Sequence, residues 1–195
     1  MKKKLLSKHQ HAYLKGHSAQ ICLVEVINYL YKLFDHKKYA AVISLDLSKA
    51  FDSISHQLML NKLAKLNLSE PTLLWIKSYL SHRKQRTKFK SYTSTEEPVT
   101  AGVPQGSIIG PLLFLCFTND IPEVFTEKCK IVGYADDTQL LVEAADMKQL
   151  MKKIEDIIET AQKWYSMNSM KNNIGKTEVL ILNIRNLKKP EKHWY

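Results

Sequence analysis

The sequence predicts an α+β fold, an antiparallel sheet of ferredoxin-like β-α-β-β-α-β order with helices on one face. Two observations carry this prediction. Once residues of about 54–106 are set aside as an insertion, the segments follow in the order strand, helix, strand, strand, helix, strand. The two middle strands are separated only by Tyr134-Ala135-Asp136-Asp137, which is typical of a hairpin. The 195 residues contain no repeat and no Gly/Ser linker, so one continuous domain is expected.

The first segments alternate helix and strand. From Ser18 to about Phe34, apolar residues recur at helical spacing, which predicts a helix. Tyr39 to Leu45 is a short apolar run with β-branched members, which predicts a buried strand. His56 to Leu66 is expected to be helical.

The middle of the chain contains a further helix, an exposed region and another helix. Ser69 is the expected cap of the first of these helices, and Pro71 lies in its first turn. Residues 82–101 mix charge, threonine and proline, which indicates exposed hairpin strands. Pro111 is expected at the start of the second helix, whose apolar body is Leu112 to Phe117.

The last third is expected to complete the sheet. Lys130–Gly133 and Thr138–Val142 are the two strands of the hairpin, and Glu178–Leu182 is a further strand. The clearest helix runs from Asp146 to about Trp164, where apolar residues keep the i, i+3, i+4, i+7 rhythm. Asp146 and Gln149 fit a capping box at its start.

The composition indicates a globular protein with an anionic partner. Lysine and arginine number 29 against 19 acidic residues, a formal net charge of +10. A merely basic surface is the alternative to nucleic-acid binding at this point. The three cysteines form no CxxC pair, so neither a zinc site nor a disulfide framework is expected, and a reducing compartment fits. No apolar stretch approaches the ~20 residues of a membrane helix, so the chain is expected to be soluble and intracellular, with no membrane partner.

Three acidic residues lie where the predicted sheet would bring them together. Asp46 directly follows the first strand, and Asp136 and Asp137 occupy the hairpin tip. The first strand of such a sheet can pair with the hairpin, so the carboxylates would converge, and divalent cations would offset their repulsion. All-oxygen ligation favours Mg²⁺ or Mn²⁺, and two such ions can clamp an in-line phosphoryl transfer. An ordinary aspartate-containing turn is the alternative.

Several short motifs follow one another along the chain. They are Asp46-Leu47-Ser48-Lys49-Ala50-Phe51-Asp52, Gly102-Val103-Pro104-Gln105-Gly106-Ser107 continuing to Gly110-Pro111, Asn119-Asp120, Tyr134-Ala135-Asp136-Asp137 and Asn173-Ile174-Gly175-Lys176-Thr177. In this order they resemble the strand-end acidic motif, the PQG segment, the Asn-Asp pair, the YxDD box and the NxxKT motif of reverse transcriptases. The resemblance covers about residues 9–185. The sequences DLSKAFD and GVPQGS are most similar to those of non-LTR retrotransposons.

This resemblance implies a polymerase palm with part of the fingers. It assigns about 9–39 and 54–106 to the fingers and an insertion, about 40–53 and 107–185 to the palm, and 186–195 to a basic tail. It also implies an RNA-directed DNA polymerase that adds dNTPs to a DNA primer on an RNA template. Two Mg²⁺ ions are the implied cofactors, with Mn²⁺ as a substitute.

The resemblance implies roles for the charged residues. Asp46 and Asp136 would bind both ions, Asp137 would lie beside them, and the carbonyl of Leu47 would help. Lys176 would approach the leaving pyrophosphate, where a cation neutralises developing charge. Without the resemblance, the alternative interpretation of Lys176 is an ordinary solvated lysine.

Nucleotide-binding residues are implied in the same way. Phe51 would be the gate beneath the incoming sugar, since a bulky ring there excludes a 2′-hydroxyl by overlap. Pro104, Gln105 and Gly106 would lie along the nucleotide and the template base, where glycine lets the backbone approach a ligand closely. Core packing for Phe51 and an ordinary turn for Gln105 are the alternatives.

A basic stretch runs from His82 to Lys90 and alternates cations with Phe89 and nearby Tyr92. This pattern suits phosphate contacts with occasional base stacking, and a solvated charged face is its alternative. The candidate nucleic-acid-binding residues are Arg83, Lys84, Arg86 and Lys88.

The sequence departs from the family pattern in three places. Ala12 stands where Gln-x-Gly-Phe has glycine, the upstream finger segment would lie before Met1, and nothing after Leu180 resembles a primer grip or thumb. We therefore expect these residues alone to bind Mg²⁺ and nucleic acid weakly and to show little processive synthesis, because the primer end must be held close to the nucleotide.

Two other functions stay open on sequence alone. One is a catalytically idle transposon-derived fragment that keeps the palm fold and weak nucleic-acid binding. The other is a metal-dependent nuclease built on clustered acids, in which the PQG and NxxKT motifs would have no role.

Overall fold

The computed structural model describes residues 5–36, 38–47, 50–170 and 177–183. The side chain of Asp46 lies outside this description, although its backbone is included. Lys176 and the basic tail at 186–195 also lie outside the described residues.

The order of elements follows the sequence prediction closely. The helices are α1 (Ala19–Asp35), α2 (Ala50–Ser53), α3 (His56–Lys65), α4 (Glu70–Leu80), α5 (Gly110–Phe117), α6 (Ile121–Phe125) and α7 (Met147–Met167). The strands are β1 (Tyr39–Asp46), β2 (Lys84–Gln85), β3 (Lys88–Phe89), β4 (Tyr92–Thr93), β5 (Glu97–Pro98), β6 (Lys130–Tyr134), β7 (Asp137–Ala144) and β8 (Glu178–Asn183). Each predicted helix and strand is confirmed, while α2 and α6 were not predicted.

The chain forms two compact units. Among the described residues, the sheet unit comprises 7–36, 38–47, 120–164 and 177–183. The helical unit comprises the described residues 5–6, 50–119 and 165–170. The assignment of residues to palm and fingers stays a prediction.

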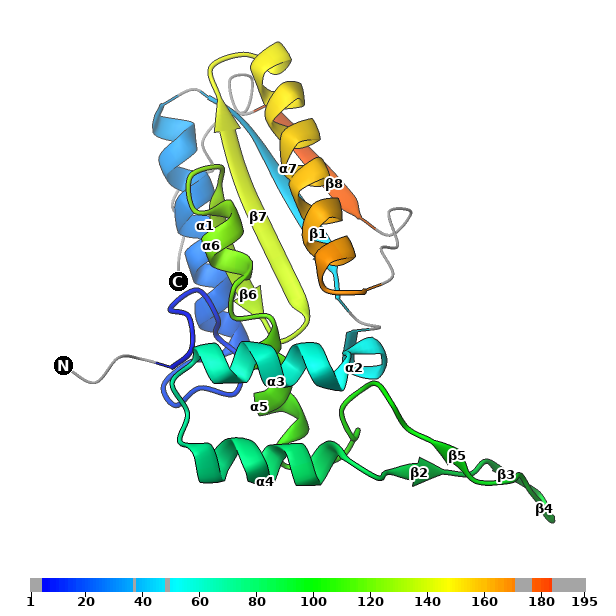
Figure 1. The fold of residues 1–195 in the computed structure, drawn as a ribbon. Helices are drawn as coiled ribbons and strands as arrows, with labels where there is room; N and C mark the ends of the chain where they lie inside the picture. The colour runs from blue at the N-terminus through cyan, green and yellow to red at the C-terminus, as the bar shows by residue number, and fades with distance from the viewer. Residues whose placement is uncertain (1–4, 37, 48–49, 171–176, 184–195) are drawn as a thin grey trace. The chain divides into compact units, whose positions relative to one another are not determined.

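The sheet unit contains a four-stranded antiparallel sheet in the order β6-β7-β1-β8 (Figure 1). This is the ferredoxin-like order that the sequence predicts, since the first strand in the chain lies between the hairpin and the last strand. The β1–β7 ladder runs from the pair Tyr39 and Ala144 to the pair Asp46 and Asp137. The first strand and the hairpin tip are thereby fixed in register.

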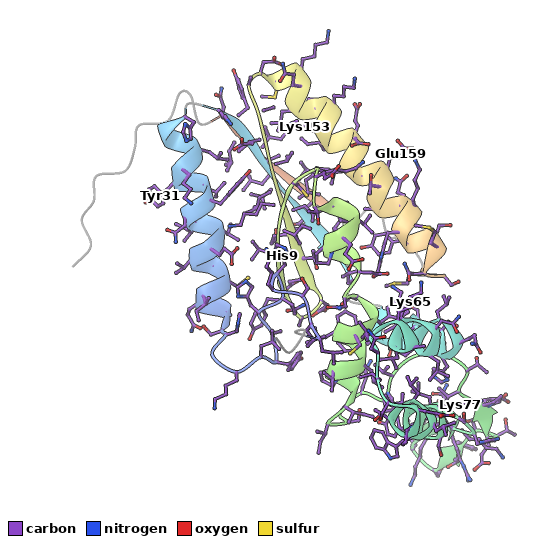
Figure 2. The ribbon with its side chains drawn as sticks, turned by 60° about the vertical axis from the view of Figure 1, so that its left-hand side comes forward. His9, Tyr31, Lys65, Lys77, Lys153 and Glu159 are labelled. Carbon is purple, nitrogen blue, oxygen red and sulfur yellow. The ribbon has the colours of Figure 1, made fainter. Side chains whose placement is uncertain are left out.

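Helices lie on both sides of this sheet, with α1 on one side and α7 on the other (Figure 2). The sequence prediction placed helices on one face only, whereas α1, which precedes β1 and so lies outside the β-α-β-β-α-β order, covers the opposite face. Leu33 of α1 packs against Ala40 of β1, with Leu182 of β8 beside them. The amphipathic helix α7 buries a stripe at helical spacing, formed by Leu150, Ile154, Ile157 and Ala161. This burial explains why apolar periodicity predicted α7 so clearly.

Side-chain hydrogen bonds cap the start of α7 and connect its last turns to the residue before α6. The Asp146 carboxylate accepts a hydrogen bond from the Gln149 backbone N–H at 2.8 Å, as the capping-box pattern predicts. Near the other end of the helix, the Trp164 indole N–H donates to the Asp120 carboxylate at 3.2 Å. The short helix α6 is therefore tied to α7 within the sheet unit.

The helical unit packs α3 against both α4 and α5. Its core includes Met59 and Leu63 of α3, Ile76 and Leu80 of α4, and residues 113–117 of α5. Two short hairpin-like pairings, β2 with β5 and β3 with β4, form an exposed arm, as predicted for residues 82–101. The arm carries no core of its own, which leaves its side chains open to solvent.

The fold bears on membrane-spanning segments and on cysteine pairing, two features considered in the sequence. Among the described residues, no helix is both long and apolar enough to cross a membrane. All three cysteines are described, and each is free of disulfide bonding. Burial raises the pKa of the Cys116 thiol to about 11 and that of Cys129 to about 12.

Candidate active site

The hairpin between β6 and β7 presents two of the predicted acidic residues. Tyr134 pairs with Asp137, so Ala135 and Asp136 form the connecting loop. Ala135 adopts a φ of +55°, in the left-handed region that residues with a Cβ seldom occupy. Asp136 is half-buried and Asp137 is exposed. Both acids therefore lie at the end of the sheet where β1 also ends.

The β1–β7 register brings the third acidic position to the same place. Asp46 and Asp137 are directly opposed as the last pair of the ladder. Opposed residues in an antiparallel ladder have Cα atoms about 4.5–5.5 Å apart. Like charges at such positions destabilise a sheet. The predicted convergence of Asp46, Asp136 and Asp137 at one end of the sheet is confirmed at the level of the backbone.

The structure leaves the metal assignment as a prediction. Among the side chains that are described, no group of three histidine, cysteine, aspartate or glutamate residues is arranged to hold a metal ion. Asp46, the acid that follows β1, is not among those side chains. Leu47, whose carbonyl was the further predicted ligand, follows the strand with a buried side chain.

Phe51 lies in α2 of the helical unit. Its ring stacks on Phe114 of α5, with ring centroids 4.1 Å apart and planes inclined by 12°. Phe114 is fully buried, whereas Phe51 is only half-buried. Phe51 is therefore partly exposed, and its ring stacks on a buried partner.

The loop at residues 102–106 contains Pro104, Gln105 and Gly106, and it is fastened to α2. The Gln105 side-chain amide donates to the Asp52 carboxylate at 2.7 Å. The Val103 backbone N–H donates to the Phe51 carbonyl at 2.8 Å. Sequence reasoning did not assign a role to Asp52, although it closes the DLSKAFD motif. Its position links that motif to the PQG segment.

Two glycines make this loop possible. Gly102 has a φ of +84°, and a Cβ there would lie 2.9 Å from the Asp52 carbonyl oxygen. A Cβ on Gly110 would lie 2.8 Å from the Ser107 hydroxyl and 2.9 Å from the Pro104 carbonyl oxygen. Any larger residue would displace backbone at either position, which accounts for glycine on both sides of the loop.

A pocket of about 640 Å³ lies beside this loop, within the helical unit. Its lining residues are Asp52, Arg83, Lys84, Gln85, Pro98 to Ala101 and Gly102 to Gln105. Two cations, one carboxylate and loop residues 102–105 thus line one volume. Such a lining suits a polar, anionic ligand.

The four predicted nucleic-acid-binding residues differ in their surroundings. Glu96 forms ion pairs with Lys84, at 3.3 Å, and with Arg86. The Arg83 guanidinium lies over the Tyr79 ring, 5.7 Å from its centroid. Lys88 is exposed in β3. The acidic partner Glu96 was not foreseen, and it offsets part of the positive charge.

An aromatic pair projects from the same arm. Phe89 and Tyr92 are directly opposed in the β3–β4 pairing, with side chains 69% and 79% exposed. Two large exposed rings beside lysines provide faces on which nucleic-acid bases can stack. The exposure of both rings agrees with the stacking role that the sequence indicates.

The sequence matches the family described as "Reverse transcriptase (RNA-dependent DNA polymerase)" over residues 1–192. The chain belongs to the reverse transcriptase family. This match also confirms the resemblance drawn from the motifs. Reverse transcriptases generally use divalent metal ions, and they act on nucleic-acid templates, primers and nucleotides.

Similar polymerases come from mobile elements of Drosophila melanogaster. The chain is 32% identical over 167 residues to the RNA-directed DNA polymerase from mobile element jockey, covering 83% of this chain and 18% of that protein. It is 29% identical over 181 residues to the probable RNA-directed DNA polymerase from transposon BS, covering 90% of this chain and 20% of that protein. This reverse transcriptase chain therefore spans about a fifth of the length of these relatives. They support the non-LTR type of the reverse transcriptase.

A solved structure supports the fold. The structure of apo telomerase from Candida tropicalis, truncated from its C-terminal domain, aligns with a TM-score of 0.65 at 12% identity. The alignment covers 89% of this chain and 36% of that one. At this identity the likeness concerns the fold alone, and it agrees with a polymerase palm.

Proposed function

We propose that this chain is the catalytic core of an RNA-directed DNA polymerase of a non-LTR retrotransposon, adding dNTPs to a DNA primer on an RNA template. The β1–β7 register supports this most strongly, because it opposes Asp46 to Asp137 and leaves Asp136 in the adjoining turn. Converging carboxylates are costly without a counter-ion, and phosphoryl transfer supplies a reason to keep them. The unpaired cysteines fit an intracellular site of action.

The acidic residues are suited to hard divalent cations, since every candidate ligand atom is oxygen. Asp46 and Asp136 would hold both ions, with Asp137 beside them and the Leu47 carbonyl as a further ligand. Two Mg²⁺ ions, or Mn²⁺ in their place, would stabilise the attacking and leaving oxygens of an in-line transfer. Lys176 is proposed, from the family resemblance, to neutralise charge on the leaving pyrophosphate.

The helical unit is proposed to contact the nucleotide and the template. Phe51 would exclude a 2′-hydroxyl, and its stacking on Phe114 would keep the ring from turning aside. Pro104, Gln105 and Gly106 would line the path of the nucleotide and template base, held by the bond from Gln105 to Asp52.

The exposed arm is proposed to bind the phosphate backbone. Arg83, Lys84, Arg86 and Lys88 supply the charge, while Phe89 and Tyr92 supply stacking surfaces. The ion pairs with Glu96 make Lys84 and Arg86 weaker contributors than their charge alone suggests.

Primer extension tests this function. A version of the chain extended at both ends is given an RNA template, a DNA primer and dNTPs with Mg²⁺. A polymerase gives templated extension that Asp136→Asn abolishes while nucleic-acid binding persists. Binding without extension by the unsubstituted protein would indicate an idle fragment, and shortening of the nucleic acid without dNTPs would indicate a nuclease.

A further inference from the structure

Gln10 lies 125 positions before Ala135 in the chain, yet its side chain contacts the YADD turn. Its side-chain oxygen accepts a hydrogen bond from the Ala135 N–H at 3.0 Å. Its side-chain nitrogen donates to the Ala135 carbonyl at 3.3 Å. One amide thus satisfies both backbone groups of the residue that precedes Asp136.

The Gln10 side chain is itself held firmly. The same oxygen accepts from the backbone N–H groups of His11, at 3.0 Å, and Ala12, at 2.9 Å. On either side, the His11 N–H donates to the Gly133 carbonyl and the Gly133 N–H donates to the His9 carbonyl, both at 2.8 Å. The segment around Gln10 therefore lies along β6 as a bridge, with its amide directed at the turn.

A charged cluster anchors this segment to α1. The buried His11 ring lies 3.1 Å from the Glu25 carboxylate, and its other nitrogen lies 3.1 Å from His17. Glu25 also forms an ion pair with Lys130 of β6 at 3.0 Å. Burial alone would raise the pKa of Glu25, but Lys130 and His11 together hold it below its usual value. Glu25 therefore ties both the segment and the strand to one helix.

The contact acts on a strained part of the hairpin. Ala135 has a φ of +55°, and it lacks the polar side chain with which asparagine or aspartate stabilises this conformation. Strained backbone of this kind persists where the surroundings over-determine it. Here the determining contact is the amide of Gln10.

We infer that Gln10 is a positioning residue, which holds the Ala135 peptide so that Asp136 is oriented to bind a divalent cation. The inference rests on the proposed function, because it assumes that Asp136 is a metal ligand. Contacts that orient a ligand typically affect metal affinity by about 10–100-fold when they are removed.

The test measures Mn²⁺ binding to the 195-residue chain by electron paramagnetic resonance, beside its urea unfolding midpoint. Gln10→Ala should weaken Mn²⁺ binding by about tenfold or more and lower the midpoint. Gln139→Ala removes another glutamine of the same sheet, one that accepts from the Ser44 hydroxyl at 2.8 Å, and should lower the midpoint alone.

Two further variants separate positioning from plain stability. Adding Ala135→Gly to Gln10→Ala removes the steric cost of positive φ, so the midpoint should recover while Mn²⁺ affinity stays low. Gln10→Glu keeps the accepting oxygen but replaces the donating nitrogen by a second oxygen facing the Ala135 carbonyl. It should weaken Mn²⁺ binding, although an added negative charge by itself would strengthen it.

The outcomes distinguish this inference from the function on which it rests. Unchanged or tighter Mn²⁺ binding in Gln10→Glu, or recovery of affinity together with stability in the double variant, would overturn the positioning role alone. Wild-type binding that is absent, or that Asp136→Asn leaves unchanged, would overturn the proposed metal site and the role of Gln10 with it.

Discussion

Asp46 and Asp137 are paired through their backbones as the last, directly opposed positions of the β1–β7 ladder. Opposed like charges cost roughly 0.2–1 kcal/mol in a sheet. In the absence of divalent cations, Asp137→Asn should therefore raise the free energy of unfolding by about this amount. With Mg²⁺ present, the wild-type chain should gain stability that the variant does not. Urea unfolding in EDTA and in Mg²⁺ measures both effects.

The matched control for this prediction is Asp146→Asn. It removes the same charge, and asparagine caps a helix as well as aspartate does, so α7 should keep its N-cap. Equal effects of the two substitutions in EDTA would show that general charge, and not the Asp46–Asp137 pairing, sets the stability.

Sugar discrimination should depend on Phe51. Phe51→Val in an active version extended at both ends should raise the use of ribonucleotides relative to deoxyribonucleotides. A loss of roughly 1.4 kcal/mol in discrimination appears as a tenfold change in the ratio of kcat/KM values. Steady-state incorporation with each nucleotide measures that ratio.

Phe114→Leu provides the comparison, because it keeps the Phe51 ring but removes the stacking partner that orients it. Sugar discrimination should therefore fall less than in Phe51→Val. Loss of an aromatic pair costs roughly 0.5–1.5 kcal/mol beyond the buried area, so this variant should be less stable. If it changed sugar discrimination as much as Phe51→Val does, packing rather than a steric gate would be responsible.

Binding of an RNA–DNA duplex should depend on salt through the exposed arm. Neutralising Arg83, Lys84, Arg86 and Lys88 together should weaken binding and reduce the log–log slope against salt by roughly 0.7–0.9 per lost phosphate contact. Glu96→Gln should act in the opposite direction, because it frees Lys84 and Arg86 from their ion pairs. Fluorescence anisotropy over a range of salt concentrations measures the slope. An unchanged slope in the neutralised variant would indicate that the arm is an ordinary solvated surface that makes no phosphate contacts.

The sheet was predictable because its signals are local. The apolar run of β1 and the two strand-like runs on either side of YADD identify the strands, and their order in the chain selects the ferredoxin-like arrangement. That arrangement also brings Asp46 to the hairpin, so the acidic cluster could be predicted without any contact information.

Other features left no local signal. The helices α2 and α6 have four and five residues, too few to show a helical period. The bond from Gln105 to Asp52 and the contact of Gln10 with Ala135 join distant residues, which no spacing rule connects. The φ of +55° at Ala135 was hidden because alanine gives no glycine signal.

Protonation of Glu25 should lower the free energy of unfolding of the chain in acid. Its pKa is lower in the folded chain than the ~4.3 of an unfolded glutamate, since Lys130 and His11 outweigh its burial. Its contribution is therefore complete above that unfolded value and is lost as the pH falls through the folded pKa. The stability difference between wild type and Glu25→Gln should narrow below about pH 4, measured by urea unfolding. A similar change in Glu155→Gln, at an exposed position of α7, would contradict the assignment to Glu25.

The most direct measurement of the proposed active site is Mn²⁺ binding to the chain and to Asp46→Asn, Asp136→Asn and Asp146→Asn. Electron paramagnetic resonance reports the free ion during titration. We expect the first two substitutions to weaken binding by about tenfold or more, and Asp146→Asn to leave it unchanged. Equal binding by all four proteins would contradict a metal site built at the meeting of β1 and the β6–β7 turn.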